Sequence, residues 1–179
     1  MDKLLTKSLK KKRPVKLLTN HPDGQSFEGI VIYLTKSLIV IREIKDFEID
    51  GVVAFPRQAI SNVIDCPVES QKKELMKRDS NERAEKMTKW LKKVKNIKDL
   101  IGYPYKSGEW VAVETVRDDD STVFVGSIQD FSGKTFCVSP SLVTDKRKKG
   151  RKVRYSDLFR IEIYSSYISS IRDYVNLSW

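Results

Sequence analysis

The chain has few side chains that could act as a general base or a nucleophile near neutral pH. It contains a single histidine, His21, and catalysis of the Ser-His-Asp or Cys-His type would have to use it. His21 precedes Pro22-Asp23-Gly24, a combination typical of a turn, so a turn residue is the simpler interpretation. We therefore expect no catalytic residues and a protein that is not an enzyme.

The candidates for a metal or cofactor site are equally sparse. Asp118-Asp119-Asp120 could bind a hard cation weakly, but the spaced ligands and bidentate glutamate of an EF-hand are missing. Cys66 and Cys137 form no CxxC pair, which argues against a zinc site or a disulfide scaffold and favours buried free thiols. No glycine-rich phosphate-binding motif is present. We expect no metal, no cofactor and no small-molecule substrate.

The formal net charge of +10 is concentrated in a few segments. Residues 1–14 hold six basic residues against one acidic, and residues 66–99 hold eleven against six, whereas residues 15–65 hold five against seven. An anionic partner such as RNA or DNA would contact the basic segments. The candidate binding residues lie in the N-terminal tail and in a loop of the second half: Lys10, Lys11, Lys12, Arg13, Lys146, Arg147, Lys148, Lys149, Arg151, Lys152 and Arg154.

Short runs rich in isoleucine and valine, separated by turn residues, predict strands in the first third of the chain. They cover residues 15–19, 27–34, 37–44, 52–55 and 61–65. Leucines in the lysine-rich segment before Pro14 predict a short N-terminal helix. The first domain is expected to be this helix and a small β-barrel, residues 1–66.

Residues 69–98 contain neither glycine nor proline, and their composition is that of a helix. Apolar residues follow helical spacing from Met87 to Ile101, and Gly102-Tyr103-Pro104 is expected to end the helix. The lysine-rich face of this linker, residues 67–102, is also explained as a solvated helix surface. A second strand set beginning at Trp110 and a final helix within 164–179 complete the second domain, residues 103–179.

The two halves share landmarks in the same order. Phe27-Glu28-Gly29 follows one strand and a polar turn, and Phe124-Val125-Gly126 does the same in the second half. Gly29 is followed 22 residues later by Gly51, and Gly126 is followed 24 residues later by Gly150. This spacing indicates an internal duplication. The alternative is two unrelated β-rich halves that each use a Phe-x-Gly motif.

The order of elements, with an apolar-x-Gly motif in a long strand, resembles the small barrel shared by Sm-like and SH3-like proteins. Phe27-Glu28-Gly29 and Phe124-Val125-Gly126 carry the resemblance, because glycine allows a strand to bend sharply. It implies a mainly β fold with helices: two small five-stranded barrels joined by a helical linker.

The resemblance does not extend to the RNA-binding residues of the Sm family. Thr35 and Ile39, and Ser132 and Phe136, stand where that family has aspartate and asparagine, so a uridine pocket of that type is unsupported. The segments IKDFEIDG and LFRIEIYSSYI are also similar to uncharacterised bacterial proteins of tandem layout, a likeness that implies no function.

Two functions from different classes remain open. The first is nucleic-acid binding by the basic segments, with Trp110 or Tyr155 exposed to stack on a base. The second is a protein-interaction role, as an adaptor or an immunity or regulatory protein. In that case an acidic loop of the first half would bind the basic loop of the second half, either within one chain or between chains arranged head to tail. The acidic residues of this loop are Glu43, Asp46, Glu48 and Asp50.

The sequence also bears on the membrane and the compartment. The start of the chain has too short an apolar run for a signal peptide, and nowhere do 18 apolar residues run together. We expect a cytoplasmic protein with no membrane partner.

Overall fold

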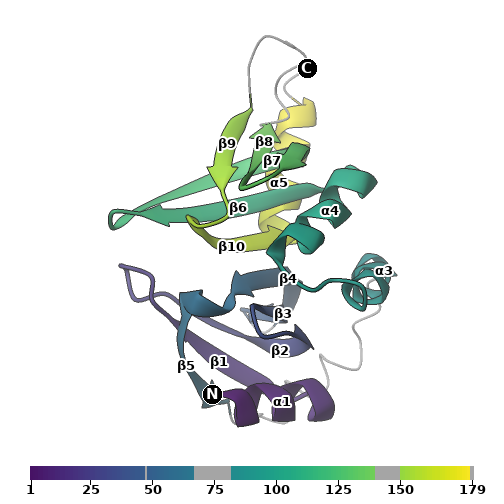
Figure 1. Cartoon of the computed structure of the whole chain (residues 1–179). Coiled ribbons are helices and arrows are strands. Elements are labelled where there is room, and N and C mark those ends of the chain that lie inside the picture. Colours follow the sequence, from purple (N-terminus) through teal and green to yellow (C-terminus); the bar gives the residue numbers. More distant parts are fainter. Residues whose placement is uncertain (47, 67–81, 140–149, 178–179) are drawn as a thin grey trace.

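The computed structural model describes residues 1–46, 48–66, 82–139 and 150–177. In these residues the fold is mainly β, as expected, with ten strands in one antiparallel sheet (Figure 1). The strand order is β5-β1-β2-β3-β4-β10-β6-β7-β8-β9. The first half of the chain supplies one end of the sheet and the second half supplies the other.

The strands of the first half lie where the apolar runs predict them. They are β1 (Pro14–Thr19), β2 (Ser26–Leu34), β3 (Leu38–Lys45), β4 (Glu48–Pro56) and β5 (Ile60–Asp65). Helix α1 (Asp2–Lys11) precedes them and buries Leu5, and a short 3-10 turn, η1 (Arg57–Ala59), separates β4 from β5. A Cβ on Gly29 would lie 2.4 Å from the backbone oxygen of Arg42, so only glycine allows β3 to pack this closely on β2.

The second half repeats this strand order. Its strands are β6 (Trp110–Arg117), β7 (Asp120–Ser132), β8 (Thr135–Ser139), β9 (Arg151–Arg154) and β10 (Leu158–Ile163). In each half the last strand in sequence pairs with the first, and the other strands follow in order. Helix α5 (Ser166–Leu177) ends the described chain and buries Ile168 and Val175.

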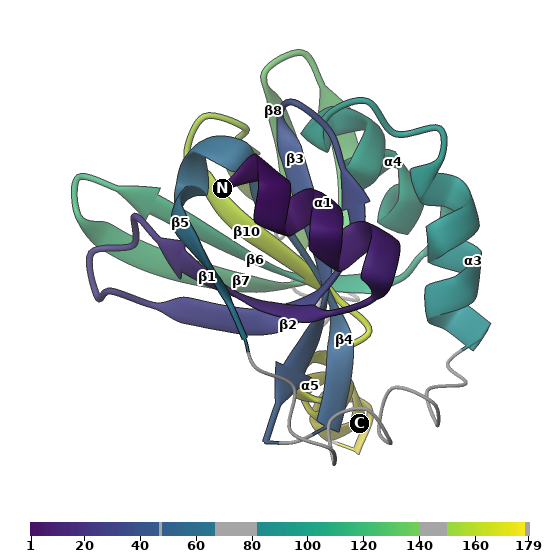
Figure 2. The same ribbon diagram turned by 90° about the horizontal axis from the view of Figure 1, so that it is seen from below.

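Two helices, α3 (Glu82–Leu91) and α4 (Ile97–Ser107), lie along one side of the sheet (Figure 2). The expectation that Gly102-Tyr103-Pro104 ends the helix is wrong, because α4 continues through these residues to Ser107 and is capped by Gly108. Leu100, Ile101, Gly102 and Pro104 are buried there, and this packing offsets the backbone hydrogen bond that the proline cannot donate. The boundary expected between residues 102 and 103 therefore falls inside a helix.

The sheet does not close into two separate barrels by its hydrogen bonding. Strand β4 of the first half pairs with β10 of the second, with Val52, Val53 and Ala54 opposite Ile163, Glu162 and Ile161. We call this pairing and its surroundings the junction. Both hydrophobic clusters cross it: Phe159 of β10 packs with Phe27 and Phe55 of the first half, and the other cluster combines β3 and β4 with the second half and helices α3 and α4. The two halves thus share their cores.

Candidate functional site

A network of ionisable side chains lies largely buried at the junction. The Nε2 atom of His21 is 3.1 Å from Oε1 of Glu114, and the side chain of Arg160 bonds both Glu114 (Nε to Oε2, 2.5 Å) and Glu162 (3.1 Å). Glu114 is 3% exposed and Glu162 is 6% exposed. We call these four residues the Arg160 network. It joins the β1–β2 connection of the first half to β6 and β10 of the second.

The network holds its charges by pairing them. Burial alone would raise the pKa of Glu114, but hydrogen bonds from Arg160 and Ser121 and the positive charge of Arg160 hold that pKa below its ordinary value. The guanidinium of Arg160 also lies over the Phe27 ring, 4.8 Å from its centroid. Since each group is engaged with a neighbour, the arrangement suits a structural joint better than proton transfer. His21 is therefore more than a turn residue.

Three carboxylates lie close together at the edge of this network, and one of them, Glu162, belongs to both groups. We call the three the carboxylate cluster. One oxygen each of Glu43, Asp50 and Glu162 lies within 4.8 Å of the others. Burial, followed by the charges of Glu162 and Asp50, raises the pKa of Glu43 to about 7, although Arg160 and Lys45 oppose the shift. A cavity of about 620 Å³ opens next to the cluster.

The carboxylate cluster has oxygen ligands of the kind that hard cations prefer, but two of its members are already engaged. Asp50 accepts hydrogen bonds from the backbone N–H (2.6 Å) and the hydroxyl (3.0 Å) of Ser166, at the start of α5. Glu162 accepts one from Arg160. A cation would have to compete with these donors, so the geometry favours hydrogen bonding over metal binding.

A second candidate surface lies at the far end of the sheet. Arg151, Lys152 and Arg154 are exposed on β9, which pairs with β8 alone in the part of the chain that the structure describes. We call these three residues the basic edge. The other predicted loop residues, Lys146, Arg147, Lys148 and Lys149, lie outside the described residues.

Two hollows flank the basic edge. One, of about 410 Å³, is lined by Lys152 and Arg154 of the basic edge together with Arg117 and Phe124. The other, of about 510 Å³, is lined by Arg154, Lys134 and Tyr155. Asp118, Asp120 and Asp157 also line the first hollow and reduce its positive charge. Trp110 and Tyr155 were expected to be exposed, but both are half-buried. Tyr155 packs against Phe136 of β8.

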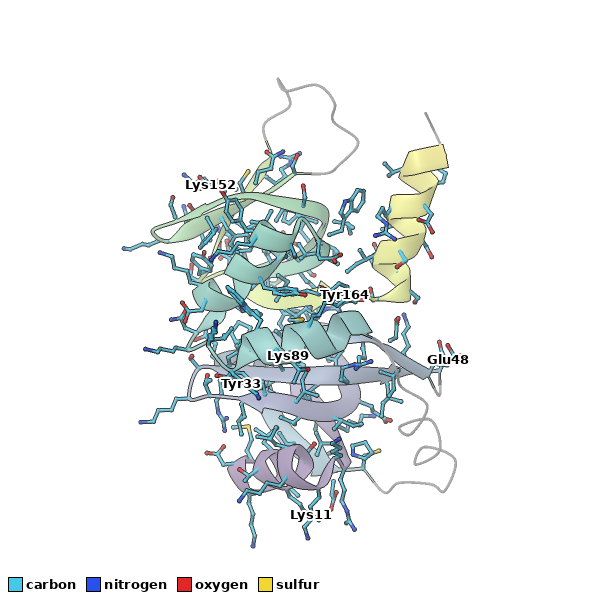
Figure 3. The ribbon with its side chains drawn as sticks, turned by 90° about the vertical axis from the view of Figure 1, so that its right-hand side faces the viewer. Lys11, Tyr33, Glu48, Lys89, Lys152 and Tyr164 are labelled. Carbon is cyan, nitrogen blue, oxygen red and sulfur yellow. The ribbon has the colours of Figure 1, made fainter. Side chains whose placement is uncertain are left out.

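The predicted basic tail lies far from the basic edge. Lys10, Lys11, Lys12 and Arg13 are exposed at the end of α1, and Figure 3 shows Lys11 and Lys152 at opposite ends of the molecule. Lysines in the last turn of a helix also interact favourably with its dipole, which is a sufficient structural reason for Lys10 and Lys11. The tail and the basic edge therefore do not form one binding surface within a single chain.

The predicted acidic loop divides into two pairs. Glu43 and Asp50 face the junction, whereas Asp46 and Glu48 are exposed at the end of the β3–β4 hairpin (Figure 3). Within the chain, the described partners of this loop are Arg160 and Ser166 rather than the basic edge. Complementary pairing of the two loops inside one chain is thus not seen among the described residues.

Sequence reasoning did not find Glu114, Arg160 and Glu162. The available signal was weak: Arg160 and Glu162 are charged residues two apart in LFRIEI, an otherwise apolar strand. Charged residues in a buried strand need an interaction partner, but the sequence does not identify that partner.

The comparisons with known proteins add no family. No helix in the described ranges is long and apolar enough to cross a membrane. Searches of protein families, curated proteins and solved structures return no match to this chain.

Proposed function

We propose that the protein is a non-catalytic binding module whose basic edge contacts an anionic polymer, RNA or DNA. One observation carries this proposal: three exposed cations lie on β9, which pairs with β8 alone among the described residues, and two of them, Lys152 and Arg154, line hollows. Phosphate contacts from such cations would fix the position of the protein on the polymer. Phe124 and Tyr155 border the hollows and offer aromatic surface next to the cations.

The salt dependence of binding measures how many phosphates the basic edge neutralises. For single strands the slope of log affinity against log salt is about −0.7 for each phosphate contact. Three contacts from Arg151, Lys152 and Arg154 therefore predict a contribution of about −2. Cations from other segments would add to this slope.

The test is fluorescence anisotropy with labelled single-stranded RNA and DNA of mixed sequence, at salt concentrations from about 50 to 200 mM, the range over which phosphate contacts lower affinity steeply. The variant carries Arg151→Gln, Lys152→Gln and Arg154→Gln, and the control carries Lys10→Gln, Lys11→Gln and Lys12→Gln at the opposite end. We expect the first variant to lose affinity and reduce the slope by about 2, and the control to lose less. Binding that is absent at low salt, or equal in both variants, would refute the proposal.

A second candidate function is protein interaction through self-association, with chains paired head to tail by their sheet edges. The observation that favours it is the pair of open edges: β5 and β9 each have one neighbour in the described part of the sheet. Unpaired edge strands are templates for pairing with another chain. The junction supplies a pattern, because there the fourth strand of one half pairs with the last strand of the other. Strands β9 and β5 are the corresponding elements left open.

The comparison of the two halves supports an internal duplication of a small barrel-like unit. Val15 and Leu17 face Gly29 and Phe27 across β1 and β2, and the second half repeats this register between β6 and β7. There Val111 and Val113 face Gly126 and Phe124. We infer that each five-stranded half derives from one ancestral barrel. A head-to-tail contact would then extend the sheet by the rule that already joins the halves.

Analytical ultracentrifugation tests the second function. Ile64 is 45% exposed on β5, and Ile64→Lys adds a charge of the kind that protects natural sheet edges. Val123 is 44% exposed on the β6–β7 hairpin, so Val123→Lys is the matched control. We expect the wild type and the control to form oligomers and Ile64→Lys to shift the distribution to monomer. A wild-type chain that stays monomeric at about 100 μM would exclude this function, because specific interfaces usually have dissociation constants well below that concentration.

A further inference from the structure

The carboxylate cluster lies between groups that hold the two halves together. Glu43 is near the end of β3, Asp50 is in β4, and Glu162 is in β10, where it faces Val53 across the junction. In the described residues β4 and β10 are paired over three residues of each strand, so the junction depends on few backbone contacts. Asp50 also holds the first residue of α5 through Ser166.

We propose that the carboxylate cluster makes the junction pH-responsive: the β3–β4 hairpin stays docked on β10 and α5 while Glu43 carries a proton, and loosens when Glu43 ionises. The inference is independent of the basic edge and of either proposed function. It concerns how firmly the two halves are joined.

Charged and titratable side chains around Glu43 come from each neighbouring element. Lys45 and Asp46 belong to its own hairpin, and Asp50 to β4. Across the cavity, β1 contributes Lys16, β2 contributes Glu28, β10 contributes Arg160 and Glu162, and α5 contributes Tyr167. The guanidinium whose positive charge acts on Glu43, that of Arg160, is shared between Glu114 and Glu162. A negative charge at Glu43 therefore meets those of Glu162 and Asp50, and only Lys45 and the shared charge of Arg160 are resolved as opposing this repulsion.

The direction of the effect follows from the position of the proton. The pKa of Glu43 is raised to about 7 in the folded chain, so the folded state holds the proton more tightly than an opened state with an ordinary carboxyl. Stability from this group is complete below its ordinary pKa of 4.5 and is lost as the pH rises through about 7. If opening restores the ordinary pKa, raising the pH from 6 to 8 increases the opening equilibrium about tenfold.

The experiment uses the full chain and two readings. Carbon-detected NMR of the glutamate carboxyls gives the titration midpoint of Glu43. Hydrogen exchange then gives protection factors, corrected for intrinsic exchange, for the amides of residues 52–54 and 161–163 at pH 6 and pH 8. The variants are Glu43→Gln, which cannot ionise, and Glu48→Gln, an exposed acid on the same hairpin.

We expect a midpoint near 7 for Glu43 and a fall of about tenfold in junction protection between pH 6 and pH 8 in the wild type and Glu48→Gln. In Glu43→Gln the protection should be equal at both values. A midpoint near 4.5 would overturn the proposal, since Glu43 would then be ionised throughout this range. A wild-type junction whose protection does not fall, or a fall that persists in Glu43→Gln, would overturn it too.

Discussion

Replacement of Arg160 by methionine tests whether the junction depends on its buried charges. Arg160 is the cation that compensates Glu114 and Glu162, which are 3% and 6% exposed. Removing one partner of a buried ion pair costs about 3–5 kcal/mol, because the other charge stays buried without compensation. The side chain of Arg160 is 20% exposed, so water reaches the site and the lower end of this range applies.

The lost cation–π contact with Phe27 adds about 0.5–1 kcal/mol. The expected loss in the free energy of unfolding is therefore about 3–4 kcal/mol. For a chain of 150–250 residues this lowers Tm by about 2–4 °C per kcal/mol, or about 6–16 °C in total.

Urea unfolding at pH 7.5, followed by tryptophan fluorescence and circular dichroism, measures this loss. Arg117→Met is the matched control, because Arg117 pairs with Asp118 on the surface, where a pair contributes less than about 1 kcal/mol. Adding Glu114→Gln to Arg160→Met should recover part of the loss, since a neutral amide replaces the uncompensated carboxylate.

The same pair of residues gives a pH dependence. The pKa of Glu114 is held below its ordinary value of 4.5, so its stabilisation is present above that value and is lost as the pH falls through the lowered pKa. The difference between wild type and Arg160→Met should therefore shrink in acid. If Arg160→Met costs no more than Arg117→Met at pH 7.5, the buried network is not what stabilises the junction.

Two further substitutions test packing, one at the junction and one between β2 and β3. Phe159→Ala should reduce the free energy of unfolding by about 3–5 kcal/mol in chemical denaturation, and a single transition reported by both halves is expected because Phe159 of β10 packs in the first half's core. Two separate transitions would contradict a shared core. Gly29→Ala should cost about 2–3 kcal/mol in thermal unfolding, because its Cβ would lie 2.4 Å from a backbone oxygen of β3. Gly24→Asn, where nothing lies within 4 Å and asparagine tolerates the positive φ, should cost less than about 1 kcal/mol; equal losses would show that close packing at Gly29 is not the cause.

The strands could be predicted because their signals are local. Each apolar run ends at turn residues, such as Asp23-Gly24 before β2, and the observed strands of the first half match the predicted ranges apart from an earlier start of β4. The pairing of β4 with β10 has no local signal, since the sequence of an apolar strand does not show which strand pairs with it. Separate closed barrels were therefore expected where one continuous sheet is found. Pro104 gave a wrong prediction for a related reason, because the burial of α4 outweighs the cost of a proline inside a helix.

The candidate sites show the same division. The basic character of Arg151, Lys152 and Arg154 could be read directly from the sequence, whereas their placement on an edge strand could not. The distance of the basic tail from that edge is likewise a property of the fold (Figure 3). The Arg160 network brings together residues up to 141 positions apart, from His21 to Glu162, and only the three-dimensional structure unites them.

The buried charges at the junction have a role that stability alone does not explain. Ile161 and Ile163 of β10 enter the hydrophobic cluster, and Arg160 and Glu162 alternate with them. A slip of β10 by one residue along β4 would exchange these faces and bury both charges among apolar side chains. In the observed register Arg160 pairs instead with Glu114, which His21 also contacts, and with Glu162. Because a hydrophobic pair at these positions would tolerate either register, our hypothesis is that the charged network favours one alignment of the two halves.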